Sequence, residues 1–287
     1  MSIRKLLLCA TLLALAGSAG AADDVAAVQF SGMIVSSTAA MPIKLAVFAD
    51  CEDGRERILG TIDGNRYRIA LPPGRVCNII VGEQQWDGDP QTVFDAGTAT
   101  ALTMLVYPRQ VAEPELAREL YDMGQQDSAI RHALAQAPHE AGLLQRLAVE
   151  DGARSKRLAQ IIGEKGWPTH SMVGAQATRG AWLVAQHAPP EQLKRWLPLM
   201  QDAAGRHEIN LPNLATSIDR VLVNDRHKQR YGSQFQARPD GVMQAEPIED
   251  IARLDARRYS MGMSSFGQYL AVMQAAPGQA GIPASQP

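Results

Sequence analysis

The N-terminal part of the chain alternates short apolar runs with residues that favour turns. The runs are rich in β-branched residues and are separated by Gly, Pro and Asp, which is typical of strands. We predict strands at Val28–Val35, Ile43–Phe48, Arg57–Ile62, Arg66–Leu71, Val76–Val81 and Thr100–Val106. Asp63-Gly64-Asn65 separates two of them and favours a hairpin, because Gly and Asn tolerate the positive φ of tight turns. Residues 25–108 are therefore predicted to form an all-β domain.

After Pro108 the apolar residues recur at helical spacing. A short linker precedes Pro114, which is well placed to open a helix. A stripe of small residues between Val173 and Ala185 favours close approach by a second helix, so we expect this helix to be central. Further helices are predicted at Glu191–Ala204, Leu211–His227, Glu249–Arg258 and Phe266–Met273. The sequence thus predicts an all-α domain over residues 113–273 and an α+β chain of two domains.

Both ends of the chain differ from these domains. Residues 1–21 begin with Arg4 and Lys5, continue with an apolar run and end at Ala19-Gly20-Ala21, the pattern of a cleavable signal peptide. The apolar run is much shorter than the ~20 residues of a membrane helix. We therefore expect an exported protein, periplasmic or secreted, with no transmembrane segment in the mature chain. Residues 274–287 are rich in Pro, Gly and Ala and are predicted to be a disordered tail.

Cysteine usage and charge restrict the function further. Cys9 lies in the signal segment, which leaves Cys51 and Cys77 as an even pair for which a structural disulfide is expected after export. The net charge of −2 argues against nucleic-acid binding. A metal site that used His170 and His187 would lack any recognised ligand spacing. We predict no metal and no cofactor.

Short motifs in the β domain carry a resemblance to a known fold. In order they are Phe30-Ser31-Gly32, Pro42-Ile43, Leu59-Gly60-Thr61 and Tyr67-Arg68-Ile69-Ala70-Leu71-Pro72-Pro73-Gly74. This order resembles the carboxypeptidase regulatory-like, or prealbumin-like, domain. The resemblance implies an antiparallel β-sandwich that serves as an accessory or adhesion module and carries no chemistry of its own.

The helical domain carries longer motifs. They are Gly166-Trp167-Pro168-Thr169, Gln186-His187-Ala188, Asp219-Arg220-Val221-Leu222-Val223-Asn224, Tyr231-Gly232-Ser233-Gln234 and Pro247-Ile248-Glu249-Asp250. Over about residues 113–273 the chain resembles a bacterial family catalogued as a domain of unknown function. Two departures from the family pattern are Pro189 after Gln186-His187-Ala188 and Ser233 in place of a common threonine. The resemblance implies no particular reaction.

Polar residues on otherwise apolar helices are the candidates for a site. The catalytic candidates are His187, Asp219 and Arg220, and the ligand-binding candidates are Asp127, Arg131, Asp151, Gln186, Gln229 and Tyr231. His187 falls in the last turn of its helix, where the helix dipole alone would favour an imidazolium. Alternatively it is a general acid or base oriented by Asp219. Asp127 and Arg131 have the i,i+4 spacing of a surface ion pair, and we favour that interpretation for them.

Two functions from different classes remain open. In the first, the protein is a binding or interaction module whose helical domain binds an unknown protein or small molecule in the cell envelope. In the second, the helical domain is a hydrolase-type enzyme that uses His187 with Asp219. The sequence contains no recognisable nucleophile turn, metal-ligand set or phosphate loop. We therefore favour the binding module.

Overall fold

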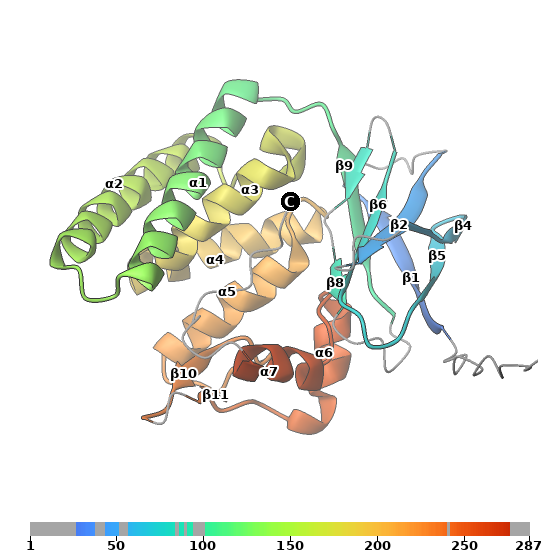
Figure 1. Ribbon diagram of the computed structural model, residues 1–287. Coiled ribbons are helices and arrows are strands. Elements are labelled where there is room, and N and C mark those ends of the chain that lie inside the picture. Colours follow the sequence, from blue (N-terminus) through green and yellow to red (C-terminus); the bar gives the residue numbers. More distant parts are fainter. Residues whose placement is uncertain are drawn as a thin grey trace, which may run out of the picture.

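The computed structural model describes residues 27–37, 44–51, 57–83, 86–88, 91–93, 101–239 and 242–275. Figure 1 shows a β-rich N-terminal region beside a helical C-terminal region. This order of elements agrees with the predicted α+β class. The predicted signal peptide at residues 1–21 lies outside the described residues. The last helix continues through Ala275, two residues into the predicted tail, and residues 276–287 are outside the described part.

The larger sheet of the β-rich region has five strands in the order β4-β5-β1-β9-β7. The strands are β1 (Val28–Ser36), β4 (Thr61–Asp63), β5 (Arg66–Leu71), β7 (Trp86–Gly88) and β9 (Met104–Pro108). β1 pairs antiparallel with β5 but parallel with β9. The prediction of a purely antiparallel arrangement is therefore wrong for this sheet. Parallel pairing requires a long crossover between the two strands. The chain between β1 and β9 is that crossover, and it includes all the strands of the second sheet.

The second sheet is antiparallel, with the order β3-β2-β6-β8. Its strands are β2 (Ala46–Cys51), β3 (Ile58–Leu59), β6 (Cys77–Gly82) and β8 (Gln91–Val93). Burial alternates along β5 and β6, so each strand turns one face inward. The inward side chains of the two sheets join one apolar cluster, to which Phe30 and Tyr67 contribute from the first sheet and Val47 and Ile79 from the second.

The single strand predicted at Arg57–Ile62 is two strands in different sheets. β3 belongs to the four-stranded sheet and β4 to the five-stranded sheet, and Gly60 lies between them. A Cβ atom at Gly60 would lie 2.4 Å from the carbonyl oxygen of Arg68. The chain can change sheets here because only glycine permits so close an approach of two backbones.

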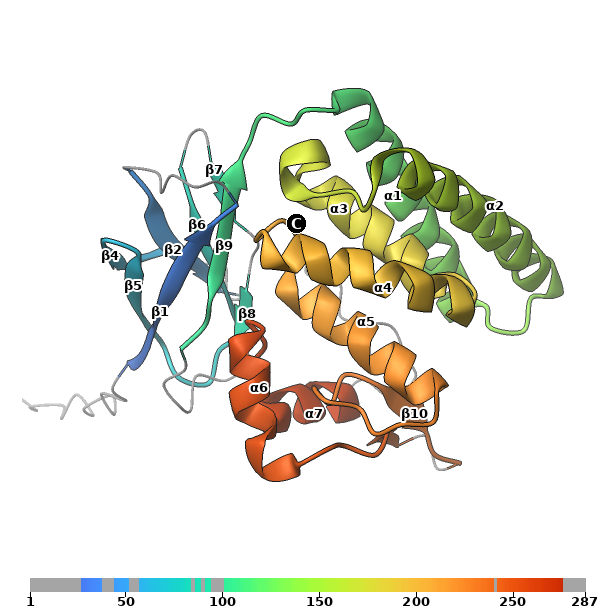
Figure 2. The same cartoon turned by 180° about the vertical axis from the view of Figure 1, so that it is seen from behind.

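The helical region contains α1 (Pro114–Gln136), α2 (Ala141–Lys165), α3 (His170–His187), α4 (Pro190–Gly205), α5 (Leu211–Asn224), α6 (Leu254–Ser260) and α7 (Phe266–Ala275). Figure 2 shows α4 passing in front of α3, with α1 behind it. α5 ends three residues before the predicted His227, and a 3₁₀ turn at Ile251–Arg253 replaces the start of the helix predicted at Glu249. The region is therefore helical largely as predicted.

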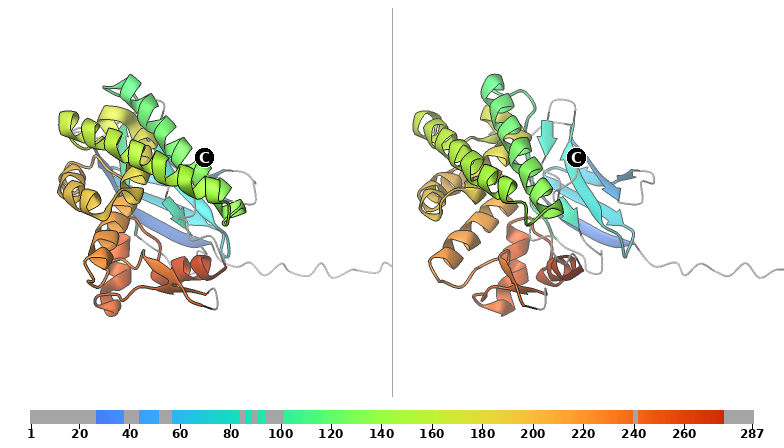
Figure 3. Two further views of the ribbon diagram at one scale, coloured as in Figure 1. Left: turned by 90° about the vertical axis from the view of Figure 1, so that its left-hand side faces the viewer. Right: turned by 60° about the vertical axis from the view of Figure 1, so that its left-hand side comes forward.

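A short antiparallel pair of strands lies within the helical region. β10 (Phe235–Ala237) pairs with β11 (Met243–Ala245). Figure 3 shows this pair, α6 and α7 together at the lower end of the helical region. The prediction of an all-α region is wrong at this point, because strands of three residues are too short to give a period-2 pattern.

α3 is the helix that joins the others. It contacts α1, α2, α4, α5 and β9, and it crosses α1 at two glycines. A Cβ atom at Gly180 would lie 2.1 Å from the carbonyl oxygen of Leu120, and one at Gly124 would lie 2.6 Å from the Cα of Gly180. The backbones of α1 and α3 therefore touch at this crossing.

The two regions meet where β9 faces the start of α3. Met104 and Val106 point into the β-rich core, whereas Leu105 and Tyr107 alternate to the opposite face and are also buried. The ring of Tyr107 lies 4.2 Å, centroid to centroid, from the imidazole of His170. The amide groups of Ala112 and Glu113 donate to the carbonyls of Ser171 and Met172, which fastens the connecting segment to α3. Whether the regions fold as separate domains stays a prediction.

None of the helices in the described part of the chain is long and apolar enough to cross a membrane.

The predicted disulfide is confirmed. Cys51 and Cys77 are directly opposed on β2 and β6, with their Cα atoms 4.0 Å apart, and their sulfur atoms are bonded.

We expect replacement of both Cys51 and Cys77 by Ala to lower the free energy of unfolding by about 3 kcal/mol, because the bridge joins residues 26 positions apart and restricts the unfolded chain. Urea titration of the wild type, with and without reductant, and of the double variant measures this. Alkylation followed by intact-mass measurement is the control. Two alkylated thiols in the absence of reductant would rule out the bridge.

Candidate functional site

The candidate site lies at the C-terminal end of α3, and the glycine crossing determines what meets there. Asp127 follows Gly124 by about one turn of α1, and His187 follows Gly180 by two turns of α3. Because the backbones of the two helices touch at the crossing, these side chains come into direct contact. His187 Nδ1 lies 3.0 Å from the Asp127 carboxylate.

The hydrogen bond between Asp127 and His187 fixes the state of the imidazole. Asp127 is 1% exposed, whereas the His187 side chain is 24% exposed. A carboxylate only accepts hydrogen bonds, so Nδ1 of His187 carries a proton. Nε2 makes no hydrogen bond to any described residue, and the ring is partly exposed. The arrangement leaves one imidazole nitrogen available to a ligand.

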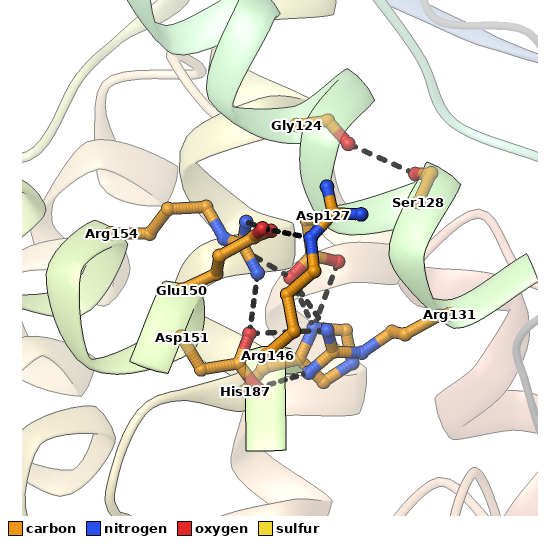
Figure 4. Close-up of polar contacts among 9 residues, drawn as sticks. All are labelled: Gly124, Asp127, Ser128, Arg131, Arg146, Glu150, Asp151, Arg154 and His187. Atoms are coloured by element: carbon orange, nitrogen blue, oxygen red, sulfur yellow. Dashed lines mark hydrogen bonds and ion pairs between the residues drawn. The ribbon is translucent and has the colours of Figure 1, made fainter. Parts of the chain in front are cut away.

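A ladder of alternating charges connects this pair to α2. Arg131 Nη1 lies 3.1 Å from Asp127 and both of its terminal nitrogens donate to Asp151, at 3.2 and 2.8 Å. Arg154 donates to Asp151 at 2.7 Å and to Glu150 at 3.1 Å. Figure 4 shows the ladder from Glu150 on α2 to His187 on α3. We call Asp127, Arg131, Asp151, Arg154 and His187 the α3-end cluster.

Arg131 and Arg154 keep the Asp151 carboxylate in its charged form. Burial raises its pKa, but the hydrogen bonds and charges of Arg131 and Arg154 outweigh burial and leave the pKa below its ordinary value. Glu150, hydrogen-bonded to Arg146 and Arg154, also has a lowered pKa. The carboxylates of α2 are therefore held in the charged form.

Arg220 and Gln186 border the cluster from α5 and α3. Arg220 Nη1 donates to the backbone oxygen of Gln186 at 2.9 Å, which satisfies a carbonyl in the last turn of α3. The Gln186 side chain donates to Ser217 Oγ at 2.7 Å. Burial lowers the pKa of Arg220, and the positive charge of Arg131 lowers it further. Arg220 is thus within electrostatic reach of the cluster.

Asp219 is in a different environment from its neighbour Arg220. Its fully buried carboxylate accepts hydrogen bonds from the amides of Arg230, Tyr231 and Ser233 and from the Ser233 hydroxyl. Burial raises the pKa of Asp219, although the amides of Ser233, Arg230 and Tyr231 oppose that rise. We call Asp219 and the 230–233 loop that it holds the Asp219 centre.

Gln229 and Tyr231 belong to the Asp219 centre as well. The buried Gln229 side chain donates to the carbonyls of Gln234 and Glu246 and accepts from the amide of Gln234, so it joins the residue after the loop to the residue after β11. The carbonyl of Tyr231 accepts a 2.5 Å hydrogen bond from the buried Arg258. The side chains of Asp219 and Gln229 thus hold backbone groups, Asp219 those of the 230–233 loop and Gln229 those of Gln234 and Glu246.

The structure therefore separates the predicted site residues into two groups. Near the end of α3 it brings together His187, Asp127, Arg131, Asp151, Gln186 and Arg220. Asp219, Gln229 and Tyr231 form the second group. The partner of His187 is Asp127, and the oxygens of Asp219 are occupied by the loop. The surface-pair interpretation of Asp127 and Arg131 is wrong, because α3 and α2 cover Asp127 almost completely.

Sequence reasoning missed three residues of these groups. Arg154 is 6% exposed, lies in the middle of the ladder and occupies the same stripe of α2 as Leu158 and Ile161. Glu150 extends the ladder outward. Tyr269 on α7 borders the Asp219 centre, with its ring centre 5.0 Å from the Arg258 guanidinium, and burial raises the pKa of its hydroxyl. The helical spacing of Asp151, Arg154, Leu158 and Ile161 places these residues on one side of α2. This spacing could have indicated from the sequence that Arg154 is buried beside Asp151.

The described residues contain no group of three or more His, Cys, Asp or Glu side chains arranged to hold a metal ion. The α3-end cluster instead offers an imidazole nitrogen and arginine N–H groups, which suit hydrogen bonding to an acceptor or proton exchange with it.

Comparison with known proteins is informative for the helical region alone. The chain matches the Family of unknown function (DUF6624) over residues 114–280. It belongs to this family. Both the α3-end cluster and the Asp219 centre lie within the matched residues. No curated protein and no solved structure matches the chain significantly.

Replacing Asp219 with Asn is expected to lower the free energy of unfolding by about 2 to 4 kcal/mol, because an amide nitrogen would then face buried N–H donors. The matched control is Asp225→Asn at the end of the same helix. Its carboxylate pairs with Lys194 in a more exposed position, and we expect less than about 1 kcal/mol. Urea titration compares them, and equal losses would contradict a structural role for the Asp219 centre.

Asp151→Asn is expected to change how stability depends on pH. Because the folded-state pKa is lowered, the contribution of Asp151 is complete above the ordinary aspartate pKa of ~3.9 and is lost as the pH falls through the lowered value. The variant should lose about 1 to 2 kcal/mol at pH 7 and show a shallower loss of stability below about pH 4. Asp122→Asn, at an exposed position of α1, is the control. Parallel pH profiles for the wild type and Asp151→Asn would refute this.

Proposed function

We propose that the protein is exported and that its helical region is a ligand-binding module whose site is the α3-end cluster together with Gln186 and Arg220. The observation that carries the proposal is the contact between Asp127 and His187, which leaves Nε2 of the partly exposed His187 without a hydrogen-bond partner among the described residues. A buried carboxylate held by an arginine keeps the ring in one orientation before any ligand arrives. Such preorganisation is expected of a binding site.

The surroundings of His187 favour binding of a polar group. Asp127 is held from two sides, by His187 and by Arg131, and Asp151 holds Arg131 in turn. A ladder of this kind restrains each member by its neighbours, so the cost of ordering the side chains is met during folding. A ligand that meets His187 or Arg131 therefore encounters rigid groups.

For the β-rich region we propose the role implied by its resemblance to the prealbumin-like sandwich, which is that of an accessory domain. The contact between Tyr107 and His170 supports a positioning role, because it fastens β9 to the first turn of α3, at the other end of the helix from the site. The disulfide between Cys51 and Cys77 supports folding in an oxidising compartment. We propose that the partner is a small molecule or protein of the cell envelope.

The same observation supports one alternative, a hydrolase-type enzyme. With Nδ1 protonated and bonded to Asp127, Nε2 of a neutral His187 has a free lone pair and can remove a proton from a bound water or hydroxyl group. In this alternative Asp127 takes the orienting role first assigned to Asp219. No serine or cysteine hydrogen-bonds His187 among the described residues, so water would be the nucleophile.

His187→Gln is expected to change the free energy of unfolding by no more than about 1 kcal/mol, because the side chain is partly exposed and Arg131 still pairs with Asp127. It should abolish the thermal stabilisation that the wild type gains from any hit in a panel of amino acids, sugars, nucleotides and small peptides. His139→Gln, at an exposed position before α2, is the control and should retain the response.

Mass spectrometry of each hit after prolonged incubation separates binding from catalysis. An unchanged compound supports the binding module, whereas a product that forms with the wild type and not with His187→Gln supports the hydrolase. A loss of stability above about 2 kcal/mol in His187→Gln, with hits retained, would assign His187 a structural role and remove the proposed site.

A further inference from the structure

Arg220 is a largely covered arginine that pairs with no acidic side chain among the described residues. Its guanidinium carries five N–H donors, and among the described residues it makes one hydrogen bond, to the backbone oxygen of Gln186. Its Nε is shielded from solvent and has no acceptor. No carboxylate lies within ion-pair distance of it in the part of the chain that the structure describes. A guanidinium in this state has most of its hydrogen-bonding capacity unused.

The nearby carboxylates are already committed to other groups. Asp127 is shared by His187 and Arg131, and Asp151 is shared by Arg131 and Arg154. Asp219, the residue next to Arg220 in the chain, accepts hydrogen bonds from four donors of the 230–233 loop. In the described part of the chain, no acidic neighbour is left to balance Arg220.

The charges of the whole area leave a positive excess. The ladder contains Arg131, Arg146 and Arg154 against Asp127, Glu150 and Asp151, so its own charges cancel. Arg220 adds one positive charge, and protonation of His187 would add another. Arg131 is close enough for its charge to lower the pKa of Arg220. Both guanidinium groups lie at the end of α3, because Arg220 contacts the carbonyl of Gln186 and Arg131 contacts Asp127, the partner of His187. Arg131 pairs there with two carboxylates, Asp127 and Asp151, and Arg220 pairs with neither.

Arg258 shows how this chain buries an arginine for a structural purpose. Arg258 is 1% exposed and also lacks a carboxylate in contact, and burial lowers its pKa to about 10. Its guanidinium nevertheless donates to the carbonyls of Ser264 and Tyr231, and its charge lies 5.0 Å from the ring centre of Tyr269. Arg220 has no comparable set of acceptors.

We propose that Arg220 and Arg131, beside His187, bind a small oxyanion, either a carboxylate or a phosphate group of the ligand. Both groups spread negative charge over two or more oxygens, which matches the planar donor pattern of a guanidinium. The bound oxyanion would supply the counter-charge that Arg220 lacks. This inference rests on the proposed function, and it names the chemical class of the ligand.

Calorimetric titration of the full chain with inorganic phosphate, with sodium acetate and with neutral acetamide tests the inference. Ionic strength is held constant with sodium chloride, so that a general salt effect is the same in every titration. We expect saturable binding of phosphate or acetate and none of acetamide. The anion that binds more tightly distinguishes a phosphate site from a carboxylate site.

Variants identify the residue responsible. Arg220→Gln should weaken binding of the anion at least tenfold, and Arg220→Lys, which keeps the charge and loses the planar donors, should lie in between. Arg157→Gln is the matched control, because it removes one positive charge from the same region at a partly exposed ion pair with Glu119. It should bind like the wild type. If Arg220→Gln does not fold, Arg220→Lys decides.

Two results would overturn the inference: no saturable binding of either anion to the wild type, or wild-type affinity in both Arg220 variants. A neutral or cationic compound that binds the wild type and not His187→Gln would leave the binding site standing while refuting its oxyanion chemistry. The absence of any hit, of whatever charge, in the compound panel would refute the proposed function itself.

Discussion

The contact of two glycines, Gly124 and Gly180, determines the geometry of the helical region. A side chain at either position would push α1 and α3 apart, since added atoms would lie within 3 Å of the facing backbone. With the helices this close, Asp127 reaches His187 and is covered by α3. The buried carboxylate then requires cationic partners, and Arg131 and the ladder on α2 provide them. The polar cluster is therefore a consequence of a backbone contact.

The succession of strands and helices could be predicted from periodicity, because most elements are long enough to show it. The exceptions have physical reasons. β7, β8, β10 and β11 have three residues each, which is too few for a pattern. The parallel pairing of β1 with β9 depends on a crossover whose path no local pattern records.

The candidate site was predictable as a set of residues and unpredictable as a set of contacts. Asp219 and Arg220 are adjacent, and successive residues of a helix point about 100° apart, so one meets the 230–233 loop and the other meets α3. Which of them would meet His187 depended on the packing of α5. The spacing of Asp127 and Arg131 correctly indicated an ion pair, but the spacing describes one helix and contains nothing about the helices that cover it.

β9 has no face that it shows to solvent, since Met104, Leu105, Val106 and Tyr107 are all buried. Ordinarily the last strand of a β domain packs within that domain alone. Recombination can then exchange the domain, including this strand, as one unit. Here half of the strand's side chains complete a surface of the other region. A gene fusion or exchange made at the apparent boundary after Pro108 would therefore carry away part of the packing around His170. Because Met104 and Val106 complete the β-rich core in the same way and β9 pairs with both β1 and β7, moving the strand with the helical region would damage the sheet instead, so such events would have to transfer the two regions together.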